Sequence, residues 1–106
     1  MIKGASVQFN HVPGDKESNL ETIRGFCAEA AQSAVQIISF PEMCITGYWH
    51  VRNLSKESIK ALSENVSNGS SVNMLKEMAD QYQLIIGAGL IEESGDGKLY
   101  NSYVVV

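Results

Sequence analysis

Hydrophobic and polar positions alternate over the first nine residues of the chain. Ala5, Val7 and Phe9 fall on one side, and polar or small residues separate them. Because successive side chains of a strand point to opposite faces, this pattern predicts a β-strand over residues 2–9 with one apolar face.

The next apolar positions recur at helical spacing. Pro13 and Gly14 predict a loop after the first strand. Ser18 followed by Glu21 has the spacing of a capping box, which predicts that a helix opens there and runs over residues 18–33. Its apolar stripe predicts an amphipathic helix packed on a sheet. The stripe consists of Leu20, Ile23, Cys27, Ala30, Ala31 and Ala34.

A second strand is predicted over residues 35–40, which are β-branched and nearly all apolar. Pro41 ends it, because proline cannot donate to a ladder of hydrogen bonds. Strand, helix and strand in this order predict a right-handed βαβ unit, in which residues 2–9 and 35–40 are parallel neighbours.

The remaining segments predict two helices and a hairpin. Turn residues over 93–97 separate two apolar runs, which should pair as antiparallel strands. The predicted segments are a loop over 42–54, a short helix over 55–65, a helix over 72–82, and strands over 84–92 and 99–106.

Length and composition narrow the class of protein. The 106 residues suffice for one domain, and 44% hydrophobic residues predict a packed core. The net charge of −4, from 8 basic and 12 acidic residues, argues against a nucleic-acid partner. We see no signal peptide and no stretch that could span a membrane, so a cytoplasmic protein with no membrane partner is expected.

Cysteine and histidine usage predicts neither a disulfide nor a metal site. Cys27 and Cys44 lack metal-ligand spacing and should be reduced thiols. His11 and His50 are too few and too far apart to suggest a metal site. The chain ends inside an apolar strand at Val106, and we therefore expect it to be a piece of a larger domain.

Glu42 is the sharpest candidate for chemistry. It follows directly on the predicted strand 35–40, and ligands bind at the carboxyl ends of parallel strands. The residues around it are apolar, which predicts a poorly solvated carboxylate suited to a general base. The alternative is a glutamate that caps a nearby helix or pairs with a basic residue.

Four segments resemble one family. The stretch Ser39-Phe-Pro-Glu42-Met-Cys-Ile-Thr-Gly-Tyr48 resembles the glutamate motif of the nitrilase, or carbon–nitrogen hydrolase, superfamily. The opening strand, the start of the first helix and the hairpin before Val106 resemble the family's flanking segments. The resemblance covers essentially the whole chain but well under half of a family domain. It implies that residues 1–106 are the N-terminal part of a single hydrolase domain.

The resemblance implies an α/β fold, namely part of an α-β-β-α sandwich with a mixed sheet and helices on one face. It also implies a Glu-Lys-Cys triad that cleaves a small amide or nitrile through a thioester, with no metal or organic cofactor, and self-association into a homo-oligomer. Only Glu42 can be carried over, as the general base. The lysine and cysteine would lie beyond Val106, so the 106-residue chain alone should be inactive.

Other residues carry weaker expectations. Cys44 could be a nucleophile beside Glu42, but a neighbouring carboxylate would raise the pKa of its thiol, and the family takes its nucleophile from another strand. Tyr48 is a candidate substrate-binding aromatic, with a packed loop aromatic as the alternative. Asn101 could bond the loop that carries Glu42, although a structural role is the alternative. The four lysines beyond this loop are expected to be solvated: Lys56, Lys60, Lys76 and Lys98.

Gly87-Ala-Gly89 does not predict a dinucleotide site, because it lies inside a strand and opens no helix. Glycines in a strand mark a bulge or a close approach of backbone. Two function classes therefore stay open. One is part of a carbon–nitrogen hydrolase, and the other is a non-catalytic α/β fragment or degenerate homologue with a binding or assembly role.

Overall fold

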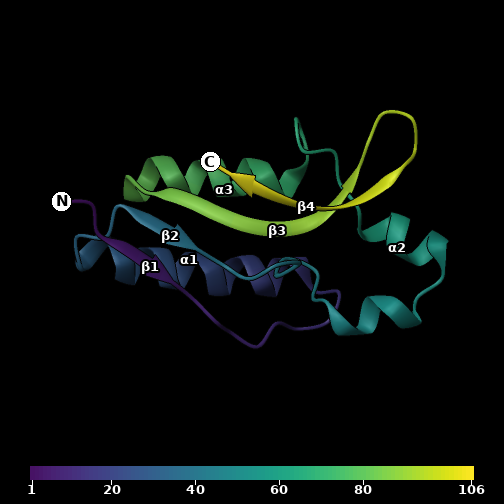
Figure 1. Cartoon of the computed structure of the whole chain (residues 1–106), viewed down its shortest axis with the longest axis horizontal. Coiled ribbons are helices and arrows are strands. Elements are labelled where there is room, and N and C mark those ends of the chain that lie inside the picture. The colour runs from purple at the N-terminus through teal and green to yellow at the C-terminus, as the bar shows by residue number, and fades with distance from the viewer.

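Four strands form one mixed sheet in which the spatial order follows the chain (Figure 1). The computed structural model describes all 106 residues. The strands are β1 (Gly4–Ser6), β2 (Ile37–Ser39), β3 (Ile85–Glu93) and β4 (Leu99–Val105). β1, β2 and β3 are parallel, and β4 is antiparallel to β3. The predicted parallel pair and the predicted hairpin are both confirmed.

β1 and β2 are shorter than predicted, at three residues each. Single backbone bonds extend the pairing beyond them, since Val7 N–H donates to Ser39 O at 2.9 Å and Phe40 N–H donates to Gly87 O at 2.8 Å. Pro41 has no N–H with which to continue the ladder, so the chain leaves the sheet there.

Helices α1 (Lys16–Gln32) and α3 (Ser70–Tyr82) pack side by side on one face of the sheet. Figure 1 shows α1 running behind β1 and β2, and α3 running behind β3. The predicted arrangement of helices on one face is confirmed. Apolar side chains from both helices and from the inward positions of the strands form the buried core. It includes Leu20, Ile23, Cys27, Ile38, Val72, Leu75, Met78, Ile86, Ala88 and Leu90.

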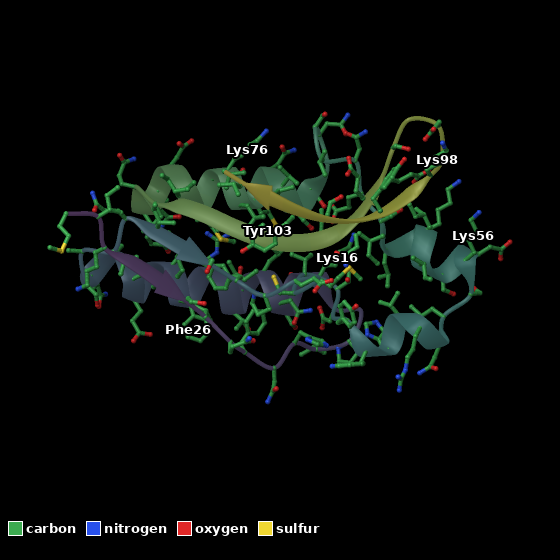
Figure 2. All side chains as sticks on the ribbon, in the orientation of Figure 1. Lys16, Phe26, Lys56, Lys76, Lys98 and Tyr103 are labelled. Atoms are coloured by element: carbon green, nitrogen blue, oxygen red, sulfur yellow. The ribbon has the colours of Figure 1, made fainter.

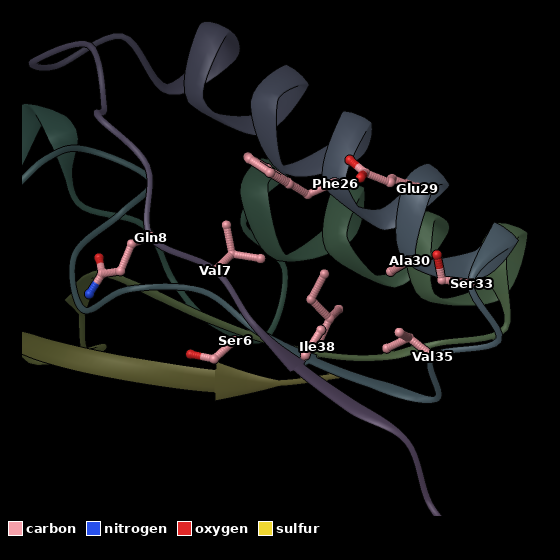
Figure 3. A pocket seen from close by; sticks show the side chains of 10 residues that line it. Ser6, Val7, Gln8, Phe26, Glu29, Ala30, Ser33, Val35 and Ile38 are labelled. Carbon is pink, nitrogen blue, oxygen red and sulfur yellow. The ribbon is translucent and has the colours of Figure 1, made fainter.

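The two faces of the sheet differ sharply at the β1 edge (Figure 3). Val7 and Ile38 point toward α1, where Phe26 packs, while Ser6 points to the opposite face. A groove of about 360 Å³ lies between α1 and this edge. The alternation of polar and apolar residues in the first strand thus places the apolar side chains on the face that packs against α1.

α1 begins earlier than predicted, and the capping box is wrong. Asp15 caps the helix, accepting a hydrogen bond from Ser18 N–H at 3.0 Å and another from the Ser18 hydroxyl at 2.9 Å. Ser18 lies inside the first turn, and Glu21 pairs instead with Arg24 at 3.3 Å. A carboxylate is the stronger acceptor for the free N–H groups at a helix start, so Asp15 sets the boundary.

The segment after Pro41 is more ordered than predicted. A 3₁₀ helix spans Trp49–Asn53 within the predicted loop. Ser55 then caps α2 (Lys56–Leu62), accepting from Ser58 N–H at 3.1 Å. This confirms the short helix, which ends before the predicted boundary at residue 65.

The helix stops early because Glu64 pairs with β3. Its N–H donates to Ile91 O at 3.0 Å, and its carbonyl accepts from Glu93 N–H at 2.9 Å. Its carboxylate also accepts from Ser71 at the start of α3, and Lys16 Nζ lies 3.0 Å from it. One residue therefore links α1, α3 and the sheet.

Neither α1 nor α3 covers the second face of the sheet (Figure 1). Exposed apolar side chains mark it, with Ile37 37%, Ile85 47%, Tyr103 47% and Val105 67% exposed. We call this surface the open face.

None of the helices combines the length and the apolar character that a membrane span requires.

Candidate active site

Glu42 lies where the chain leaves the carboxyl end of β2. Backbone bonds to β3 hold the segment on both sides of it. Phe40 N–H donates to Gly87 O at 2.8 Å, and Ile45 N–H donates to Gly89 O at 3.2 Å. The predicted position at the end of the second strand is therefore confirmed.

The backbone of this segment presses directly against β3 at Gly89. A Cβ on Gly89 would lie 2.9 Å from Glu42 Cα and closer still to Met43 N. Only glycine leaves room for this approach, which confirms the expectation that glycine in this strand marks a close backbone contact. Met43 sits in the left-handed region with φ 54°, and its side chain is buried. This turn leaves the Glu42 side chain exposed beside β4.

Two side chains of β4 hold the Glu42 segment from the open face. Asn101 Nδ2 donates a hydrogen bond to Glu42 Oε1. The Tyr103 hydroxyl donates to Phe40 O at 2.8 Å. Its ring occupies the space above Gly87, where a Cβ would lie 2.7 Å from a ring carbon. Figure 2 labels Tyr103 near the middle of the sheet.

Tyr103 keeps its proton for this bond. Burial raises the pKa of Tyr103 above its ordinary value of 10.0. The phenol therefore stays neutral and serves as a donor to the Phe40 carbonyl at physiological pH.

The prediction of a poorly solvated carboxylate in a pocket is wrong for these 106 residues. Glu42 is exposed. It lines none of the five main cavities, and neither does Tyr48. The apolar neighbours Phe40, Met43 and Cys44 are buried, whereas the carboxylate lies outside the core. An apolar hollow of about 170 Å³ does lie beside it, lined by Met43 and Asn101 among others.

Comparison with known proteins identifies the family. The profile of the carbon–nitrogen hydrolase family matches residues 3–106. The chain belongs to the carbon–nitrogen hydrolase family.

Relatives of known sequence agree. The chain is 30% identical over 106 residues to a nitrilase from Pyrococcus abyssi, which covers 100% of this chain and 39% of the relative. It is 35% identical over 113 residues to a protein N-terminal amidase from Schizosaccharomyces pombe, which covers 99% of this chain and 38% of the relative. This carbon–nitrogen hydrolase chain thus spans less than two fifths of the length of each relative.

Solved structures share its fold. An N-terminal amidase crystal structure superposes with a TM-score of 0.77 at 27% identity, covering 95% of this chain and 24% of the amidase. An amidase from Nesterenkonia sp. superposes with a TM-score of 0.74 at 20% identity, covering 98% and 37% of the two chains. The fold class is confirmed, since one mixed sheet with helices on one face forms one side of an α/β sandwich.

Asn19 anchors the far side of the loop that follows Glu42. It is 1% exposed, and its side chain makes three hydrogen bonds. Nδ2 donates to Ile45 O and Val12 O, both at 2.9 Å, and Oδ1 accepts from Val12 N–H at 2.7 Å. We did not predict this role from the sequence. The available signal was a polar residue on the same helical stripe as Ile23 and Cys27.

Cys44 faces the hydrophobic core. It is 2% exposed and packs among the residues beneath the sheet. Burial raises the pKa of the Cys44 thiol to about 11, so the thiol stays protonated at neutral pH. Cys27 is 0% exposed, and burial raises its pKa to about 11 as well. Both behave as small buried hydrophobes.

The remaining candidates lie at the surface. Figure 2 shows Lys56, Lys76 and Lys98 at the outer rim, and all three are exposed, as predicted. Tyr48 is 43% exposed and packs edge-on against Trp49, with ring centroids 5.5 Å apart. No group of three or more His, Cys, Asp or Glu side chains is placed to hold a metal ion.

Proposed function

We propose that this chain supplies the general-base glutamate of an enzyme that hydrolyses a non-peptide carbon–nitrogen bond, and that Glu42 is that base. The observation that carries the proposal is the attachment of Glu42 at a strand end, with one carboxylate oxygen bonded to Asn101 and the other not. Residues 1–106 then form the N-terminal part of one hydrolase domain, whose lysine and cysteine follow Val106.

In the proposed reaction with an amide, Glu42 accepts the cysteine proton as sulfur attacks the amide carbon. The lysine stabilises the negative charge that develops on the amide oxygen. The carbon–nitrogen bond breaks as Glu42 returns the proton to nitrogen, so ammonia leaves and a thioester remains. Water then attacks the thioester and gives a proton to Glu42. The carbon–sulfur bond breaks as Glu42 returns this proton to the cysteine sulfur, so the carboxylic acid leaves and the free thiol is restored.

An amide is the substrate class that the relatives favour. A protein N-terminal amidase matches in sequence, and solved structures of an N-terminal amidase hold Asn-Glu and Gln-Val peptides. We therefore propose that the side-chain amide of an N-terminal Asn or Gln is the first substrate to test. Small nitriles are the second, because of the Pyrococcus nitrilase. Tyr48 is the proposed substrate-binding aromatic.

The test is Glu42→Gln in the complete protein, assayed by ammonia release from amide peptides and small nitriles. Because Glu42 is exposed and the substitution keeps its shape, the fold should survive. We expect turnover to fall by about 10²-fold or more, the usual contribution of a general base. The matched control is Glu77→Gln, an exposed glutamate on α3, which should leave turnover unchanged. Near-normal turnover in Glu42→Gln would remove Glu42 from the mechanism.

The same assay on the 106-residue chain made alone should detect no ammonia. The chain would hold a base without a thiolate or an oxyanion partner, and such groups act as a unit. Turnover that disappeared in its Cys44→Ala variant would show Cys44 to be the nucleophile. If the complete wild-type protein released no ammonia from any of these substrates, the alternative of a non-catalytic homologue with a binding or assembly role would be favoured.

A further inference from the structure

We infer that Asn101 is a positioning residue for Glu42, which holds Oε1 so that Oε2 is the oxygen that exchanges protons during the reaction. This inference rests on the proposed general-base role of Glu42. It assigns a function to a residue that is 59 positions away in the sequence.

The geometry makes the direction of the bond unambiguous. An ionised carboxylate can only accept hydrogen bonds, whereas an asparagine amide can donate only from its nitrogen. Asn101 therefore presents Nδ2 to Glu42 Oε1. No other side chain bonds either oxygen of Glu42 among the hydrogen bonds of the chain, so Oε2 stays free.

The hairpin register aims Asn101 at this oxygen. Asn101 pairs with Ile91 of β3, and Tyr103 pairs with Gly89. Residues two apart on a strand share a face, so the amide and the phenol both project from the open face. Tyr103 fixes the backbone at Phe40 O, and Asn101 fixes the carboxylate two residues further on. Together they constrain both ends of the short Phe40–Glu42 segment.

A constraint of this kind serves catalysis more than stability. Asn101 is exposed, as is Glu42, so their bond contributes little to folding. The terminal torsion of a glutamate side chain is broad, and nothing else in the chain limits it. A displacement of a reacting group by about 1 Å can cost about 10²-fold in rate. Holding one oxygen restricts where the other can lie.

The experiment uses the complete protein and three variants beside Glu42→Gln. Asn101→Ala removes the donor without adding charge. Asn101→Asp keeps the shape but places a second carboxylate against Glu42. Asn73→Asp makes the same chemical change at an exposed position of α3 and serves as the matched control. For each variant, kcat and KM are measured across pH with the best substrate, together with the thermal midpoint of unfolding.

We expect Asn101→Ala to lower kcat by about 10²-fold with little change in KM, because the base is misplaced and substrate contacts are kept. Asn101→Asp should lower kcat at least as far and move the acid limb of its pH profile to higher pH. In this variant two carboxylates lie side by side, and their repulsion favours binding a proton. Glu42 is then protonated, and cannot act as a base, at a pH where the wild type is still active. Asn73→Asp should match the wild type.

Two results would overturn the inference while leaving the proposed function intact. In the first, Glu42→Gln is inactive but both Asn101 variants keep the kcat and the pH profile of the wild type. The other is a loss of kcat that follows the thermal midpoint alone, with the pH profile unmoved. If Asn101→Asp fails to fold, the kcat and KM of Asn101→Ala decide. An active Glu42→Gln variant would refute the proposed function first.

Discussion

Gly89→Ala should damage this protein out of proportion to the single methyl group that it adds. The new Cβ would lie 2.9 Å from Glu42 Cα and from the Glu42 carbonyl carbon, and closer still to Met43 N. These are backbone atoms, which cannot rotate away as the end of a side chain can. The Glu42 segment must therefore lift off β3 or β3 must bend.

The magnitude follows from three contributions. Overpacking a filled site costs about 1–3 kcal/mol. Lifting the segment breaks the bond from Ile45 N–H to Gly89 O, which contributes about 1 kcal/mol. Replacing glycine in a strand returns about 0.5–1 kcal/mol by restricting the unfolded chain. The net expectation is a loss of about 1–3 kcal/mol in the free energy of unfolding, with kcat lower by about 10²-fold as Glu42 moves.

Two other glycines provide graded controls. Gly25 lies within α1 with nothing within 4 Å of its Cβ position, so Gly25→Ala should raise stability by about 0.5–1 kcal/mol. At Gly87 the new Cβ meets the Tyr103 ring at 2.7 Å, and that side chain can move. Gly87→Ala should therefore cost less than Gly89→Ala. Urea unfolding followed by circular dichroism gives the free energies, and ammonia release gives kcat.

The result that would refute this reasoning is a Gly89→Ala variant with the stability and kcat of the wild type. It would mean that the backbone of Glu42 does not rest on β3. A cost in Gly87→Ala equal to that in Gly89→Ala would also contradict it, because the backbone beside Gly89 should yield less than the Tyr103 side chain beside Gly87.

Three further predictions concern the supports of the site. Although burial raises it, hydrogen bonds from Ser71 and a neighbouring lysine hold the pKa of Glu64 below its ordinary value of 4.5. The stability that Glu64 contributes is thus present above about pH 4.5 and is lost as pH falls through its lower folded pKa. Glu64→Gln should therefore lower the free energy of unfolding by about 3 kcal/mol at pH 7, and this difference should shrink steadily as the pH falls below 4.5. A difference that did not change with pH would contradict the prediction. Asn19→Ala should cost about 2–4 kcal/mol by calorimetry, because it leaves buried backbone groups such as Ile45 O without partners, and a cost near zero would exclude that role. Cys44 should resist iodoacetamide at neutral pH in the native protein and react once unfolded, and Cys44→Ala should keep turnover; rapid native modification would contradict its burial.

The spacing of hydrophobic residues along the sequence was enough to predict the main helices and strands and the parallel pairing of the first two strands. Period-two alternation predicted the first strand, and the apolar stripe after residue 18 predicted α1, because side-chain direction repeats with the geometry of the backbone. Turn residues between two apolar runs predicted the hairpin. The strand-helix-strand order further predicted the parallel pair of β1 and β2. Boundaries were less secure where two caps competed, since both Asp15 and Ser18 suit a helix start and only the structure shows Asp15 in that role.

The position of Glu42 at a strand end could also be predicted, because Pro41 must break the ladder that precedes it. Its surroundings could not. The apolar neighbours in sequence suggested a buried carboxylate, but the chain turns at Met43, which has φ 54°, and Glu42 is exposed while Met43 and Cys44 are buried.

Only the tertiary structure decided what touches Glu42. Asn101 reaches it from β4, and Gly89 makes room for its backbone from β3. These contacts depend on the register between strands that are distant in the sequence, and a shift of one residue would turn each side chain to the other face. Periodicity along the chain carries no information on that register. The sequence by itself therefore determined the family, the elements and the candidate base, and the packing of distant strands decided how that base is held.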